Sequence, residues 1–180
     1  MRNAGFDFEV QPSQIVEEMQ QGEPPEEFVR RAAREKAMQV AASCPAGSFV
    51  LGADTVVVID GETLGKPSGQ QDATRMLRLL SGRTHQVHTG ICLVRAPGEI
   101  EALKHKTTSV TFRELDEEES RSYVESGEPL DKAGAYAVQG LASRFVTRIS
   151  GCYFNVVGLP VPLVCEILKP LEKLVLEKLA

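Results

Sequence analysis

This sequence has no tryptophan, only four cysteines and three histidines, and no excess of positive charge. Its 25 acidic residues outnumber its 20 lysines and arginines, and a net charge of −5 disfavours sequence-independent binding to nucleic-acid backbones. The cysteines form no C-x-x-C pair, which argues against a zinc site and a thioredoxin-like dithiol. No apolar stretch approaches the ~20 residues of a membrane-spanning helix, and the N-terminus has no signal-peptide core. We therefore expect a cytoplasmic protein with no membrane or nucleic-acid partner.

Three motifs of nucleotide-binding proteins and hydrolases are also absent. There is no G-x-x-x-x-G-K-S/T loop, no G-x-G-x-x-G turn and no G-x-S-x-G elbow. His85, His88 and His105 lack the helical spacing of metal ligands, and we interpret the first two as hydrogen-bonding residues of a sheet. The usual P-loop, dinucleotide and serine-hydrolase functions therefore have no support.

The length of 180 residues, with 42% hydrophobic and 25% charged side chains, is typical of one globular domain. Strand and helix patterns alternate along the chain, which predicts a single α/β domain over residues 1–180 with a mixed sheet flanked by helices. The predicted helices cover residues 24–43, 68–82, 116–124 and the chain after 159. The predicted strands cover 6–10, 49–59, 86–94 and 103–112, with a final hairpin of 144–149 and 153–157.

Two charged residues stand where apolar side chains are expected. Lys36 falls in the middle of the apolar arc of the helix 24–43, either snorkelling to its rim or reaching an anion in a cleft. Asp54 lies inside the valine-rich strand 49–59, where a carboxylate is costly unless a cation, a metal or several donors satisfy it. A structural hydrogen-bonding role is the alternative for Asp54.

Further polar residues complete a set that suits phosphate chemistry. Glu17 and Asp54 could hold a divalent cation, while Lys36 and Lys66 could meet phosphate oxygens, although loop lysines such as Lys66 usually face solvent. The Pro-, Gly- and Ala-rich segment 128–140 is typical of a shaped loop over a site. It carries the polar residues Glu128, Asp131, Lys132, Tyr136 and Gln139.

Several motifs of this chain closely resemble the Maf family of nucleoside triphosphate pyrophosphatases, in the family's order and over essentially the whole chain. The motifs are Leu51-Gly52-Ala53-Asp54-Thr55-Val56-Val57, Leu64-Gly65-Lys66-Pro67, Leu80-Ser81-Gly82-Arg83-Thr84-His85-Gln86-Val87, Gly127-Glu128-Pro129-Leu130-Asp131-Lys132-Ala133-Gly134-Ala135-Tyr136-Ala137-Val138-Gln139-Gly140 and Asn155-Val156-Val157-Gly158-Leu159-Pro160.

The resemblance implies an enzyme that cleaves a nucleoside triphosphate to its monophosphate and pyrophosphate with Mg²⁺ or Mn²⁺. It implies that Asp54 accepts a proton from water and that Glu17 joins Asp54 at the metal, with Glu18 as the nearby competitor. Lys36 and Lys66 correspond to phosphate-facing lysines of the family. The family also tends to form homodimers.

Substrate choice follows from the same resemblance. The glutamine at position 139 is similar to the residue found there in the branch of the family that acts on dTTP and UTP. The role implied for such an enzyme is the removal of non-standard pyrimidine nucleotides. The alternative is the branch that acts on 7-methyl-GTP. Gln139 offers both an amide donor and an acceptor to a pyrimidine edge. Thr55 is the second specificity position, and Lys132 is expected to bind substrate too.

Members of the family typically begin with a strand ending in S-x-S-P-R-R, followed by a helix, and this sequence has neither the strand nor the motif. The family's substrate-contacting arginine in that motif has no counterpart here. We expect that the natural protein starts upstream of Met1; the competing explanation is a truncated product. The second explanation leads to an alternative function, a catalytically impaired nucleotide-binding protein that regulates cell division.

Overall fold

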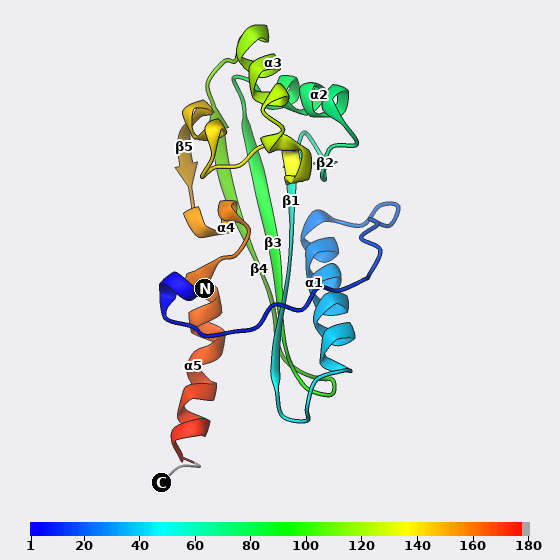
Figure 1. Cartoon of the computed structure of the whole chain (residues 1–180), viewed down its shortest axis with the longest axis vertical. Coiled ribbons are helices and arrows are strands. Elements are labelled where there is room, and N and C mark those ends of the chain that lie inside the picture. The colour runs from blue at the N-terminus through cyan, green and yellow to red at the C-terminus, as the bar shows by residue number, and fades with distance from the viewer. Residues whose placement is uncertain (178–180) are drawn as a thin grey trace.

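Five strands form one sheet in the order β2-β1-β3-β4-β5 within residues 1–177, the part of the chain that the computed structural model describes (Figure 1). The strands are β1 (Phe49–Ile59), β2 (Glu62–Leu64), β3 (Thr84–Arg95), β4 (Glu99–Phe112) and β5 (Val146–Ser150). The helices are α1 (Pro25–Ala41), α2 (Gln70–Leu80), α3 (Glu117–Glu125), α4 (Tyr153–Val157) and α5 (Val161–Glu177). Four 3₁₀ turns are η1 (Arg2–Ala4), η2 (Glu128–Asp131), η3 (Ala133–Ala135) and η4 (Leu141–Phe145).

The predicted α/β domain is confirmed, but every strand pair in this sheet is antiparallel, and the expectation of a mixed sheet was wrong. Asp60 and Gly61 both have positive φ, 50° and 80°, and form a two-residue hairpin turn between β1 and β2. Helix α2 then lies at the end of the sheet where β1 finishes (Figure 1). Because α2 does not cross back along the sheet, β3 starts at that same end and must run antiparallel to β1.

Helix α1 lies very close to β1 and β3, because small residues meet at their contact. A Cβ atom on Gly52 would come 2.3 Å from the carbonyl oxygen of Ala33, and one on Gly90 would come 2.0 Å from that of Val29. The buried Ala37 of α1 also lies against Gly52. This close approach brings the face of α1 that carries Lys36 directly over the strand that carries Asp54.

The largest cluster of buried apolar side chains includes residues of α2 and α3, which lie at the end of the sheet away from α1 (Figure 1). Edge-to-face aromatic contacts join Tyr136 to Phe112, and Phe145 to both Phe112 and Tyr123. The segment 133–138 packs into this cluster, so the core supports one wall of the site described below. In residues 1–177 no helix is both long and apolar enough to cross a bilayer.

Two predicted strands are absent. Residues 6–10 belong to no helix or strand in the described chain, and residues 153–157 form helix α4. The β-branched and aromatic side chains of 153–157 favour a strand, but tertiary contacts decide otherwise. The buried amide of Asn155 donates to the carbonyl oxygen of Val87 at 2.9 Å and to Thr108 Oγ1 at 3.2 Å, while Gly158 ends the helix with a φ of 114°.

Candidate active site

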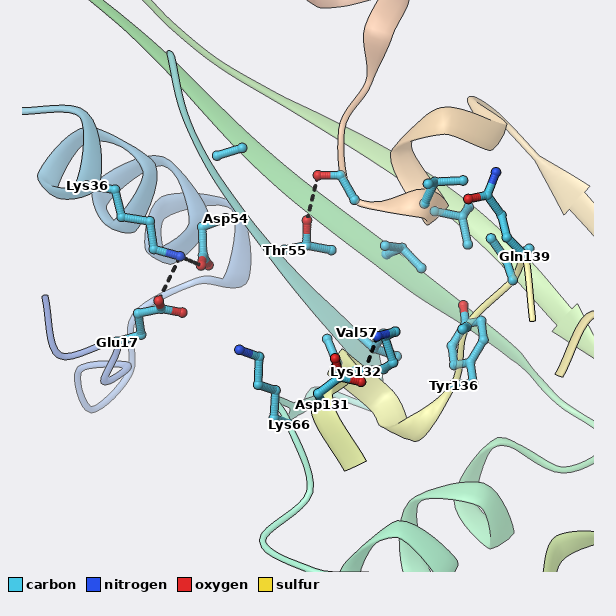
Figure 2. Close-up of a pocket in the computed structure, with 18 residues that line it drawn as sticks. Glu17, Lys36, Asp54, Thr55, Val57, Lys66, Asp131, Lys132, Tyr136 and Gln139 are labelled. Carbon is cyan, nitrogen blue, oxygen red and sulfur yellow. Dashed lines mark hydrogen bonds and ion pairs between the residues drawn. The ribbon is translucent and has the colours of Figure 1, made fainter. Parts of the chain in front are cut away.

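A cavity of about 390 Å³ opens between α1, β1, the loop after β2 and the segment 131–139 (Figure 2). All seven residues selected from the sequence line it, although they come from segments far apart in the chain. They are Glu17, Lys36, Asp54, Thr55, Lys66, Lys132 and Gln139. The fold therefore brings the whole predicted set together.

Lys36 joins the two carboxylates at one end of the cavity. Its Nζ atom lies 2.6 Å from Asp54 Oδ1 and 2.8 Å from Glu17 Oε1 (Figure 2). Asp54 is buried, Lys36 is half-buried and Glu17 keeps 43% of its side chain exposed. The inward direction that the sequence predicted for Lys36 is confirmed, and the lysine reaches carboxylates of the protein itself.

Burial and charge shift the pKa values of these three groups. Burial raises the pKa of Asp54 above its ordinary value, against the opposing hydrogen bond and charge of Lys36. Burial acts in the same direction on Glu17, but there Lys36 outweighs it and the pKa of Glu17 is lowered. Burial disfavours the ammonium of Lys36, yet the two carboxylates together raise the pKa of Lys36. Asp54 is thus the carboxylate that more readily takes up a proton.

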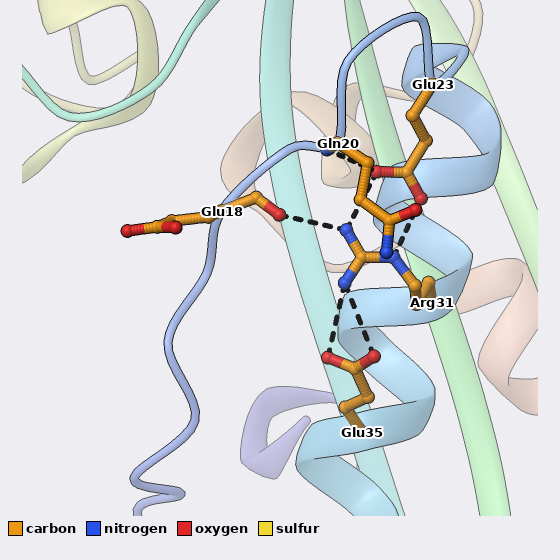
Figure 3. A network of polar contacts seen from close by, with 5 residues as sticks. All are labelled: Glu18, Gln20, Glu23, Arg31 and Glu35. Carbon is orange, nitrogen blue, oxygen red and sulfur yellow. Dashed lines mark hydrogen bonds and ion pairs between the residues drawn. The ribbon is translucent and has the colours of Figure 1, made fainter.

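Arg31 of α1 holds in place the irregular segment that carries Glu17 (Figure 3). Its guanidinium donates two hydrogen bonds of 2.7 Å to the carboxylate of Glu23 and one of 2.9 Å to the carbonyl oxygen of Glu18. Figure 3 shows the side chain of Glu18 pointing away from α1. Glu17, and not its competitor Glu18, therefore meets Lys36 and Asp54.

Two lysines line the cavity away from Asp54. Lys66 follows β2, and its loop is joined to η3 by a hydrogen bond from the amide of Gly134 to the carbonyl oxygen of Gly65. The ammonium of Lys132 lies 2.6 Å from Asp131, which lines the cavity as well. The charges of Lys66 and Lys132 face the same space as the carboxylates of Asp54 and Glu17.

Thr55 and Gln139 occupy different parts of the wall. The hydroxyl of Thr55 lies 2.9 Å from Thr89 Oγ1 and donates to the carbonyl oxygen of Gly158 at 3.4 Å. Gln139 is exposed in the loop after Tyr136 (Figure 2). Sequence reasoning missed the part of the wall built by residues 156–158, because it treated the preceding residues as a strand instead of α4. The turn residue Gly158 was the available signal for a helix end.

The histidines have the structural roles expected of them. His85 is buried and its Nε2 atom lies 2.9 Å from the hydroxyl of Tyr136, while His88 contacts Gln86 and Thr107. Burial lowers the pKa of His85 to about 4. Among the side chains that the structure describes, no three His, Cys, Asp or Glu residues gather into a metal-binding group. The carboxylates of Asp54 and Glu17, which share the ammonium of Lys36, are the candidates for a cation in this cavity.

Comparison with known proteins agrees with the motifs. Residues 1–171 match the family described as Maf-like protein. This chain belongs to the Maf family. Three curated relatives of this Maf chain carry the name dTTP/UTP pyrophosphatase. That of Koribacter versatilis is 47% identical over 94% of this chain and 86% of its own length; that of Moorella thermoacetica is 49% identical over 91% and 84%; that of Symbiobacterium thermophilum is 49% identical over 89% and 81%.

Proposed function

We propose that this Maf protein hydrolyses dTTP and UTP between the α and β phosphorus atoms and releases a nucleoside monophosphate and pyrophosphate. The observation that carries the proposal is the charge arrangement of one cavity, where the carboxylates of Asp54 and Glu17 face Lys36, Lys66 and Lys132. Lysines compensate the charge of a triphosphate, while paired carboxylates suit a divalent cation between protein and phosphate. The names of the relatives supply the substrate.

Asp54 is the general base of this proposal. It accepts one proton from the water that attacks the α phosphorus, and pyrophosphate leaves with the bonding electrons of the broken phosphoanhydride. Burial raises the pKa of Asp54, which strengthens it as a base, while the hydrogen bond from Lys36 at 2.6 Å favours the ionised form of the carboxylate. Lys66 and Lys132 bind the departing phosphates and stabilise their growing negative charge.

Asp54 and Glu17 fit a divalent cation such as Mg²⁺ or Mn²⁺. Their oxygens already share one cationic group, the ammonium of Lys36, at 2.6 and 2.8 Å. Magnesium sites in enzymes of phosphate chemistry commonly use one or two carboxylates, with phosphate and water oxygens completing the shell, so two carboxylates suffice. When bound, the cation neutralises phosphate charge and polarises the phosphorus that is attacked.

Gln139 and Thr55 give the proposal its pyrimidine preference. The exposed amide of Gln139 can donate to and accept from one base edge. The hydroxyl of Thr55 is held by Thr89 and Gly158, which limits the directions in which it can form a hydrogen bond with a substrate.

We also propose that the protein is a homodimer in the cytoplasm. Light scattering of the purified protein tests the dimer.

A pyrophosphate-release assay tests the function. The panel contains dTTP, UTP, GTP and 7-methyl-GTP with Mg²⁺ or Mn²⁺, and we expect faster release from dTTP and UTP. It is run on this chain and on a chain extended by the S-x-S-P-R-R segment of the family. Faster release from 7-methyl-GTP would assign the other branch, and nucleotide binding without pyrophosphate release from either chain would favour the regulatory alternative.

The role of Asp54 is tested by Asp54→Asn, which keeps the size of the side chain and removes its basicity. We expect this variant to lose turnover with dTTP while its fold and nucleotide affinity stay close to those of the wild type. Asp60→Asn is the matched control, because Asp60 lies on the same hairpin but in the exposed turn. Turnover of Asp54→Asn comparable to the wild type would refute the assignment.

A further inference from the structure

Gln139 lies in a short turn that is anchored from outside the cavity. The amide of Gly140 donates to the carbonyl oxygen of Ala137 at 3.0 Å and closes a four-residue turn with Val138 and Gln139 at its centre. Val138 is buried in the core, whereas Gln139 is exposed. The direction of the Gln139 side chain therefore depends on how the two ends of this turn are held.

Tyr123 and Glu128, at the end of α3 and the start of η2, hold both ends. The amide of Ala137 donates to the hydroxyl of Tyr123 at 3.2 Å, and that hydroxyl donates to Glu128 Oε1 at 2.9 Å. The amide of Leu141 donates to Glu128 Oε2 at 3.0 Å. The phenol thus binds the first residue of the turn, and the carboxylate binds the residue that follows it.

The packing around these groups leaves little room for another arrangement. A Cβ atom on Gly140 would come 2.3 Å from both oxygens of Glu128, so the turn lies directly against the carboxylate. Tyr123 is fully buried, and its ring contacts Phe145 edge to face with centroids 5.2 Å apart. Neither Tyr123 nor Glu128 is among the residues that line the cavity.

We infer that Tyr123 and Glu128 are positioning residues that set nucleobase selectivity by fixing the turn that carries Gln139. This inference rests on the proposed function, because it assigns Gln139 the reading of the base. Asp54 and Lys36 lie in β1 and α1, and Lys132 lies before this turn, at the end of η2, so no residue of the turn itself takes part in the hydrolytic step. Loss of either anchor lets Gln139 sample other directions and weakens its preference for a pyrimidine edge.

Tyr123→Phe is the sharpest variant, because it removes two hydrogen bonds of the hydroxyl and keeps the buried ring. We expect the ratio of kcat/KM for dTTP to that for GTP to fall about five- to tenfold. In free energy this change corresponds to roughly one net hydrogen bond. The change should appear in KM for dTTP, with kcat within about twofold of the wild type. Tyr153→Phe is the matched control, since Tyr153 is 40% exposed on α4.

Glu128 is tested by a graded pair of variants. Glu128→Ala removes both acceptors, whereas the single amide oxygen of Glu128→Gln can accept from only one of the two donors. We therefore expect the selectivity of Glu128→Gln to fall between those of Glu128→Ala and the wild type. Glu125→Gln, at an exposed site on α3, is the control. Amide hydrogen exchange at Ala137 and Leu141 should become faster in the anchor variants, with thermal unfolding reporting the global fold.

The outcomes separate this inference from the proposed function. Equal losses with dTTP and GTP, or folded variants with faster exchange but unchanged selectivity, would overturn the positioning role. If neither this chain nor the extended chain releases pyrophosphate, the proposed function is refuted, and Kd values from calorimetry for dTTP and GTP replace the kinetic ratio. A dTTP preference in binding that Tyr123→Phe weakens would then support the inference, whereas a wild type without preference would overturn it.

Discussion

Replacing Lys36 with methionine removes the cation that the carboxylates of Asp54 and Glu17 share. Asp54 is 6% exposed and would remain buried without its 2.6 Å partner. Removing one partner of a buried ion pair costs about 3–5 kcal/mol. Lys36 and Glu17 keep 19% and 43% of their side chains exposed, so water relieves part of this cost. We expect a loss of about 2–3 kcal/mol in the free energy of unfolding at pH 7.

The loss should depend on pH in a defined direction. Burial raises the pKa of Asp54 in the folded protein above the 3.8 of a free side chain. The contribution of protonated Asp54 to the free energy of unfolding is therefore fully present below pH 3.8, and it is lost as the pH rises through the pKa of Asp54 in the folded protein. Lys36→Met removes the group that opposes the increase in the pKa of Asp54. The free energy of unfolding should therefore fall more steeply with rising pH and continue to fall to higher pH, by up to about 1.4 kcal/mol per pH unit.

Urea unfolding of the variants between pH 4 and pH 8 measures this effect. Arg34→Met removes an exposed cation from the same helix and should change stability by less than about 0.5 kcal/mol. The double variant Lys36→Met with Asp54→Asn should regain most of the loss, because it has no buried carboxylate to ionise. A loss that is independent of pH and is not relieved by Asp54→Asn would refute the reasoning.

Two further outcomes follow from the fold. Gly90→Ala places a methyl group 2.0 Å from the carbonyl oxygen of Val29, so thermal unfolding should show that the free energy of unfolding falls by about 3 kcal/mol or more. Gly69→Ala is the control, because Gly69 has open space around it. Equal Tm values for the two variants would contradict the contact. Burial lowers the pKa of His85 to about 4, so stability present above pH 6.5 should fall by about 3 kcal/mol as the pH drops through 6.5 to 4. His85→Gln should flatten this acid limb in urea unfolding and exposed His105→Gln should not; an unchanged limb in His85→Gln would contradict burial as the cause.

Local signals in the sequence predicted most elements. The helix that begins at Glu117 has acidic residues in its first turn, and Asp116 and Glu119 form a capping box there. The Asp60-Gly61 pair is typical of the two-residue hairpin turn that joins β1 and β2. Such signals succeed because caps, turns and amphipathic periodicity act within a few residues. Residues 153–157 are an exception, because they favour a strand locally but form helix α4. The buried hydrogen bonds from Asn155 to β3 and β4 outweigh their strand propensity.

The sequence by itself determined the family, the inward direction of Lys36 and the seven candidate residues, because motifs and helical periodicity are properties of neighbouring residues. Only the tertiary structure decided which of them touch. Glu17 reaches Lys36 because Arg31 anchors its irregular segment, and the turn of Gln139 is held by Tyr123 and Glu128. These contacts join chain segments through packing and hydrogen bonds, and no spacing along the chain encodes their distances.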